Sequence, residues 1–149
     1  MAGKNKVERG FRILVDDSGG TPRDLCSDLV VGSVSGGGLT FDQVDVTGVC
    51  ETVRNYLAGQ ADAPISASFH MNDTATTGAT TVLNGIVGSA GTVTLQWGEN
   101  GNAPATGDPE WEGEYLLLSA PVSLDGNKFV HQVSFVPSGS TSPAWGTVA

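Results

Sequence analysis

Three glutamates at alternate positions, Glu110, Glu112 and Glu114, are the residues whose type and spacing come closest to a chemical site. On a strand they would share one face, and paired carboxylates can act as acid and base in hydrolysis. Such a pair needs two different environments that separate the two roles, whereas these three glutamates have similar neighbours in DPEWEGEY. We therefore interpret them as an acidic surface, and a small hydrolase is the weakest interpretation of the chain.

The other candidate chemical groups are isolated from one another. Cys50 and His70 have the types of a nucleophile and its base, but no third residue stands out that would orient them. His70 and His131 lack the spaced carboxylates of a metal site, and the acidic pair at 16–17 and Asp108 lack the spacing of a calcium loop. The sequence therefore predicts neither catalysis nor a metal or other cofactor.

Three tryptophans, Trp97, Trp111 and Trp145, have the side chains that stack on sugars in carbohydrate-binding β-sandwiches. Large aromatic residues are more often core or interface anchors. A carbohydrate-binding module remains an alternative at this point.

The charge is divided unevenly along the chain. The net charge is −9, of which residues 1–12 carry +3 and the remainder −12. An acidic body repels nucleic-acid phosphates, which argues against tight binding of DNA or RNA. We interpret residues 1–10 as a basic arm and residues 11–149 as a single domain. No apolar run is long enough to predict a membrane helix.

The stretch 41–73 predicts a short helix followed by a strand. Val49, Val53, Tyr56 and Leu57 have helical spacing, and Gly59 follows where a helix would end. The alternation over 65–71 predicts a strand. A second short helix is expected within 73–88, where two glycines weaken the pattern.

The remaining elements are expected to be strands, because charged residues are few (15%) and turn-forming glycines are many (21). Strands are predicted at 11–15, 25–31, 39–46, 93–97 and 115–124, the last closed by the turn 125–127 and followed by a returning strand to 136. Both faces of the hairpin 115–136 carry apolar residues. We therefore expect one face to pack on the chain's own core and the other to be covered by something else, which could be another subunit. The predicted fold is mainly β: a sandwich or barrel flanked by one short helix.

The order of several segments carries a resemblance to a known family. These segments are ILVDDSGG, LTFDQVDVTG, ETVRNYLAGQADAPISASF, DTATTGATTVL, TVTLQWGENG, the turn at 125–126, and the ending SFVPSGS with WGTV. Together they resemble the major tail tube proteins of long-tailed, non-contractile (siphovirus-type) bacteriophages.

The resemblance implies a structural virion protein without enzymatic activity. Subunits of that family form hexameric rings whose inner sheets join edge to edge, and the rings stack into a hollow tube through which DNA is ejected into the host. The implied partners are further copies of the chain, a tape measure protein that sets length, and tail-end proteins. DNA would pass through the lumen without specific binding. The implied location is the virion tail, after assembly in the host cytoplasm.

From these implications we place candidate interface residues. The arm residues Lys4, Lys6 and Arg9 are assigned to the adjacent ring, and the glutamates to an acidic surface or lumen. The hairpin is assigned to the barrel between subunits. Its candidate interface residues, together with the tryptophan near the C-terminus, are Phe129, Val133, Phe135 and Trp145. A capsid decoration protein remains a second alternative, because it would share the glycine-rich β character.

Overall fold

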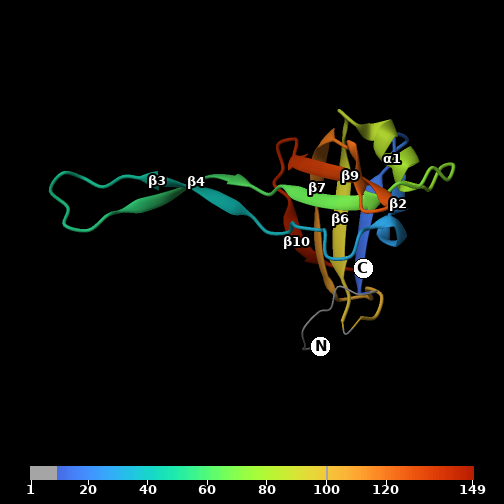
Figure 1. The fold of residues 1–149 in the computed structure, drawn as a ribbon. Helices are drawn as coiled ribbons and strands as arrows, with labels where there is room; N and C mark the ends of the chain where they lie inside the picture. The colour runs from blue at the N-terminus through green and yellow to red at the C-terminus, as the bar shows by residue number, and fades with distance from the viewer. Residues whose placement is uncertain (1–9, 100) are drawn as a thin grey trace.

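The computed structural model describes residues 10–99 and 101–149 as a β-sandwich with one short helix and one long projecting ribbon (Figure 1). The strands are β1 (Phe11–Asp16), β2 (Pro22–Asp24), β3 (Thr40–Asp45), β4 (Tyr56–Asp62), β5 (Ile65–His70), β6 (Ala90–Trp97), β7 (Pro109–Ser119), β8 (Val122–Asp125), β9 (Lys128–Pro137) and β10 (Ala144–Thr147). The helices are η1 (Cys26–Asp28), a single 3₁₀ turn, and α1 (Ala79–Ile86). The predicted mainly β class with a short flanking helix is confirmed.

The body of the molecule is one antiparallel sheet that folds over at β7. The strand order is β2-β1-β6-β7-β9-β5, with β10 also paired to β7 and β8 to β9. One side of β7 pairs with β10 over 109–112 and with β9 over 115–119. Gly113 lies at this change of partner, and a Cβ there would come within 2.6 Å of Pro143. The close approach of the two segments therefore requires glycine.

The space between the layers is filled by alternate residues of the strands, as strand periodicity requires. Trp111 and Tyr115 are almost completely buried, and the indole Nε1 of Trp111 donates a hydrogen bond of 2.8 Å to the Tyr115 hydroxyl. That hydroxyl donates in turn to the carbonyl of Ala63, also at 2.8 Å. The buried polar atoms of both aromatic residues are thus satisfied.

Helix α1 covers part of the core with an apolar stripe. Val82, Leu83 and Ile86 are buried, and they recur at the spacing of one helical face. The Gly78 N-cap provides no side-chain oxygen, but the carboxylate of Asp28 accepts a hydrogen bond of 3.1 Å from the N–H of Ala79. A residue distant in sequence therefore caps the helix.

The structure places the helix differently from the main sequence prediction. Residues 47–58 form no helix; they belong to the hairpin of β3 and β4. The α-helix found among the described residues lies within 73–88, the weaker of the two predicted helical segments. The predicted strand at 25–31 is also wrong, because Cys26–Asp28 forms the 3₁₀ turn η1. The predicted strand 115–124 is divided into β7 and β8 at Ala120 and Pro121.

Hydrogen bonds between nearby polar residues explain why a ribbon replaces the helix. Asp45 Oδ1 accepts a bond of 2.9 Å from the N–H of Thr47, and Thr47 Oγ1 accepts one of 2.8 Å from the N–H of Asn55. Arg54 Nη1 lies 2.7 Å from Asp45 Oδ2. These bonds connect the two sides of the loop where it leaves β3 and enters β4, and such local bonds compete with helix formation. The residues of the predicted helical stripe also remain exposed, since their own chain provides no core for them to pack in; they are Val49, Val53, Tyr56 and Leu57.

Among the described residues, no helix is long and apolar enough to cross a membrane.

Candidate assembly surfaces

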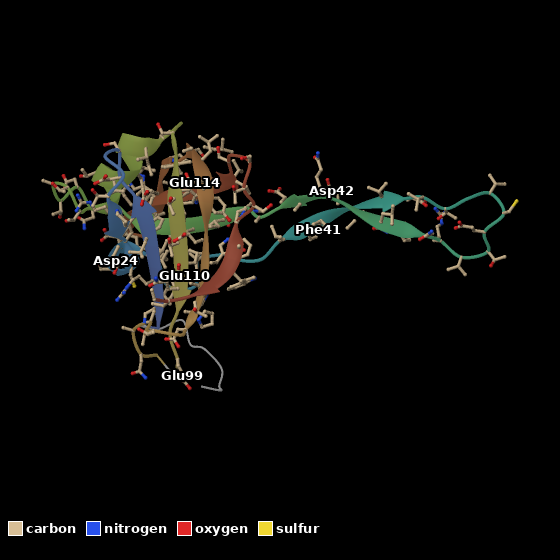
Figure 2. All side chains as sticks on the ribbon, turned by 180° about the vertical axis from the view of Figure 1, so that it is seen from behind. Asp24, Phe41, Asp42, Glu99, Glu110 and Glu114 are labelled. Carbon is tan, nitrogen blue, oxygen red and sulfur yellow. The ribbon has the colours of Figure 1, made fainter. Side chains whose placement is uncertain are left out.

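The outer face of the sheet that contains β1, β6, β7 and β10 is acidic. Glu110, Glu112 and Glu114 share this face of β7, and Figure 2 labels Glu110 and Glu114 on it. Each glutamate accepts a hydrogen bond from the strand beside it, β6. The three donor pairs are Gln96 Nε2 to Glu110 (3.1 Å), Thr94 Oγ1 to Glu112 (3.2 Å) and Thr92 Oγ1 to Glu114 (2.6 Å).

This arrangement does not resemble a catalytic carboxylate pair. All three glutamates accept a hydrogen bond from a neutral side chain of β6, so their environments are alike and nothing separates an acid role from a base role. None of the three ion pairs among the described residues involves them. The face is a row of similar negative charges, and the assignment of the three glutamates to an assembly surface or lumen stays a prediction. The sequence did not identify the Thr and Gln donors.

Asp16 extends the acidic face at one end. Its pKa is raised from the ordinary value of 3.8, chiefly by burial and also by repulsion from Glu114, Asp17 and Glu112. The pKa of Asp17 is lowered by hydrogen bonds, first from the N–H of Thr21 and then from the Arg23 side chain. The two adjacent aspartates therefore have opposite electrostatic environments.

The β3–β4 ribbon is the second surface, and it consists almost entirely of exposed residues. It projects far from the body, as Figure 2 shows around Phe41 and Asp42. Every residue of β3 is exposed, and Gly59 is the exception in β4. The exposed large apolar side chains between 39 and 57 are Leu39, Phe41, Val44, Val46, Val49, Val53, Tyr56 and Leu57. A ribbon that buries so little within its own chain is suited to packing against another molecule.

A third, smaller apolar surface surrounds β8. Leu124 (65% exposed) pairs with Phe129 (57%), and the N–H of Met71 bonds to the carbonyl of Phe129 on the other side. Leu118 and Val122 are also exposed. Phe129 is thus available to a partner.

The structure separates the predicted interface residues into buried and exposed ones. Val133 (4% exposed) and Phe135 (1%) lie in the chain's own core, so they do not present an apolar surface to another subunit. Their alternation with Ser134 places them on the inner side of β9. Phe129 and Trp145 remain exposed, and Lys4, Lys6 and Arg9 lie outside the described residues.

The three tryptophans form one cluster at the β10 edge. The ring of Trp145 lies 5.2 Å from that of Trp97 and 5.2 Å from that of Trp111. Trp111 is buried, whereas Trp145 is 56% exposed. The cluster joins β10 to the core and leaves one indole partly uncovered at the end of the sheet.

The structure does not bring the candidate chemical groups together. Cys50 is exposed in the loop of the ribbon, and His70 lies on β5 of the body. His131 is buried, with Nε2 2.9 Å from Thr80 Oγ1 and Nδ1 3.0 Å from the Ala120 carbonyl. Within residues 10–99 and 101–149, no group of three or more His, Cys, Asp or Glu is placed to hold a metal ion.

The cavity beneath the end of α1 is small. It has a volume of about 100 Å³ and is lined by residues that include Asp16, Ile86 and Tyr115. Pockets that bury small ligands usually have about 300–1,000 Å³. This cavity is therefore a poor candidate for a sugar or substrate site.

Solved tail-like particles contain chains with the same fold. A chain in the virion of a native gene transfer agent particle is 17% identical, with a TM-score of 0.65 over 99% of this chain and 100% of that one. A chain in the baseplate of the anti-feeding prophage is 11% identical (TM-score 0.67, 97% of each chain). A chain in the sheath–tube complex of an extracellular contractile injection system is 15% identical (TM-score 0.60, 94% of this chain and 90% of that one).

These identities are low, so the likenesses establish a shared fold. No protein-family model matches the sequence, and no curated protein matches it. The fold is thus one that also occurs in chains of a gene transfer agent, of the anti-feeding prophage and of a contractile injection system.

Proposed function

We propose that this chain is the tube subunit of a tail, in which hexameric rings stack into a hollow conduit. The β3–β4 ribbon is the observation that carries the proposal. It exposes a row of large apolar side chains and extends well beyond the body of its own chain. A two-stranded ribbon of this kind is only marginally stable in water, so it needs a surface on a neighbouring copy.

Within this proposal the ribbon joins one ring to the next. Residues 40–62 are long enough to cross the boundary between stacked subunits, since each strand residue adds about 3.3 Å. The basic arm, with Lys4, Lys6 and Arg9, is assigned to the same boundary.

The acidic face is assigned to the lumen. Glu110, Glu112 and Glu114 point away from the core, and no ion pair of the described residues offsets them. A wall of like charge prevents phosphates from adhering, so DNA can slide through without specific binding. The further partners are a tape measure protein and tail-end proteins, and the location is the virion tail. The order of the sequence motifs supports the non-contractile tail type, and the proposed role is structural rather than enzymatic.

Electron microscopy of the purified protein over a range of concentrations tests the proposal. We expect rings or hollow tubes of uniform diameter. In a variant with residues 42–60 replaced by a short Gly-Ser turn, we expect a folded body that no longer forms tubes. A matched variant shortened in the exposed loop at 102–106 should still form them.

Two results would contradict the proposal. Tubes of normal length from the variant without the ribbon would show that the ribbon does not join rings. A protein that stays monomeric, also when mixed with its tail partners, would favour the alternatives, a capsid decoration protein or a carbohydrate-binding module. Binding to capsids or to sugar arrays separates these two.

A further inference from the structure

The apolar residues around β8 form a surface at one end of the sandwich, which we call the β8 surface. Its members are between 44% and 65% exposed, and they are Met71, Val122, Leu124 and Phe129. Val122 pairs with the buried His131, and Leu124 pairs with Phe129. Paired residues of antiparallel strands share one side of the sheet, so the β8 surface continues the core side of β9. An apolar surface of this kind marks a site of contact with another molecule.

The cover that the chain itself provides ends just before the β8 surface. Oγ1 of Thr80, in the first turn of α1, lies 2.9 Å from Nε2 of His131. Two residues before His131 on β9, Phe129 is already exposed. An open hollow beside Phe129 is lined by His70, Met71, Asp73 and Lys128. The hollow and the exposed ring of Phe129 can therefore accept side chains of a partner.

The β8 surface and the β3–β4 ribbon lie at opposite ends of the body. Strand β4 leads into β5 with only Ala63 and Pro64 between them, and Met71 follows the last residue of β5. Strand β5 therefore runs from the root of the ribbon to the β8 surface. Figure 1 shows the same arrangement, with the ribbon on one side of the body and α1 on the other. A shift of one copy along β5 brings its ribbon to the β8 surface of the next copy.

We propose that the β8 surface is the docking surface for the ribbon of a second copy in the adjacent ring, with Phe41 of the ribbon packed beside Phe129. The inference rests on the proposed tube function, and it specifies the surface that receives the ribbon. A contact between opposite ends of a molecule is heterologous, so it can repeat from copy to copy. It covers both apolar surfaces at once, whereas contact between two β8 surfaces would give a two-fold dimer and leave both ribbons uncovered.

The lengths of the strands select the part of the ribbon that meets the β8 surface. Strands β3 and β5 have six residues each and therefore span about 20 Å each, at about 3.3 Å per residue. When two copies abut along β5, the β8 surface of one copy lies beside the root of the other copy's ribbon. Phe41 pairs with Ala61 at this root. The loop 46–55 then extends over the rest of the neighbouring body.

The charges at the two ends of the body are complementary at one position. Each of the three arginines in the described part of the chain forms an ion pair, and Lys128 takes part in none of these three pairs. Asp125 pairs with Lys128 across the turn and Asp73 lines the same hollow, but neither forms one of these ion pairs. On the ribbon, Asp42 is exposed next to Phe41 and is likewise outside the three pairs. We therefore expect Asp42 of one copy to approach Lys128 of the next.

Two serine substitutions on the β8 surface test the docking surface. In the full chain, Leu124→Ser and Phe129→Ser together remove its two most exposed side chains. We expect the protein concentration needed for tubes to rise by about tenfold or more, as the loss of apolar anchors predicts, while single rings still form. Thermal unfolding should stay close to that of the wild type, because exposed substitutions cost little. Val31→Ser, at an exposed position outside the β8 surface, is the matched control and should stack normally.

An exchange of the two charges tests the register of the contact. Asp42→Lys and Lys128→Asp should each impair stacking, because like charges would meet, and the double variant should recover it. The control combines Lys128→Asp with Glu51→Lys, which lies in the ribbon loop, and should recover nothing. Sedimentation of tubes over a range of concentrations measures all of these variants.

The outcomes distinguish the inference from the proposed function. Normal stacking of the double serine variant, or recovery by Glu51→Lys in place of Asp42→Lys, would overturn the docking surface and leave the tube function intact. Failure of the double charge exchange to recover any stacking would overturn the contact between Asp42 and Lys128. A wild-type protein that forms neither rings nor tubes, also when mixed with its tail partners, would overturn both the inference and the proposed function.

Discussion

The body and the ribbon of this molecule bury their apolar residues in different places. In the body, Phe69 is 0% exposed and packs in the core of its own chain. In the ribbon, Phe41 is 53% exposed and has no comparable environment. Two phenylalanines of one chain thus have different roles. Phe69 stabilises the fold, and under our proposal Phe41 stabilises only the assembly.

Alanine at these two positions gives the largest contrast. Phe69→Ala should lower the free energy of unfolding by about 3–5 kcal/mol, because it leaves a cavity in the core. Phe41→Ala should change it by less than about 0.5 kcal/mol, as exposed substitutions usually do, and should instead impair tube formation. Chemical denaturation and sedimentation of tubes measure the two effects. Equal destabilisation by both variants would contradict the distinction between body and ribbon.

Two glycines sharpen the comparison within the body. Gly113→Ala places a methyl group against Pro143, and we expect a loss of about 1–3 kcal/mol from overpacking. A Cβ added at Gly146 would meet no residue beyond its chain neighbours within 4 Å, so Gly146→Ala should leave thermal unfolding nearly unchanged. If both variants melted at the wild-type temperature, the position where β7 changes its partner strand from β10 to β9 would not require a glycine.

The smallest expected effects concern the pH dependence of Asp16 and Asp17. The raised pKa of Asp16 means that its charged form opposes folding, so Asp16→Asn should increase stability at pH 7. This gain should vanish as the pH falls below the ordinary value of 3.8. The lowered pKa of Asp17 means that its contribution is present above 3.8 and is lost at lower pH, so Asp17→Asn should decrease stability at pH 7.

Urea denaturation of both variants at pH 7 and pH 3 measures these changes. Variants that shift stability in the same direction at pH 7 would contradict the assignment of opposite environments to the two carboxyls.

Several strands of the body, among them β1, β5 and β6, could be predicted from the sequence because their alternation reflects a buried and an exposed side, whereas β2 and β10 were not predicted. Ile65, Ala67 and Phe69 are buried and Ser66 is exposed, as the pattern indicates. The pattern at 49–57 gave a wrong helix, because its apolar residues face no part of their own chain. Periodicity identifies the apolar side chains that share one face of an element. It does not show what buries them, and in the ribbon no other part of the chain does so.

The candidate site was predicted in part for the same reason. The acidic row on β7 follows directly from alternation in DPEWEGEY. The burial of Val133 could not be separated from the exposure of Phe129, because both belong to one apolar face of a predicted strand. That face extends past the end of the core, and only the three-dimensional arrangement shows where the covering layer stops.

The neutral donors of the acidic face have a consequence for the solution around the assembled protein. Because Thr92, Thr94 and Gln96 bring no charge, their hydrogen bonds leave the charge of the three glutamates uncompensated, and mobile ions gather at this face. The Debye length is about 10 Å at 0.1 M ionic strength and about 30 Å at 0.01 M. Under the proposed ring, with this face lining the opening, repulsion between the walls would therefore strengthen at low ionic strength, and dissolved salt would stabilise the assembly.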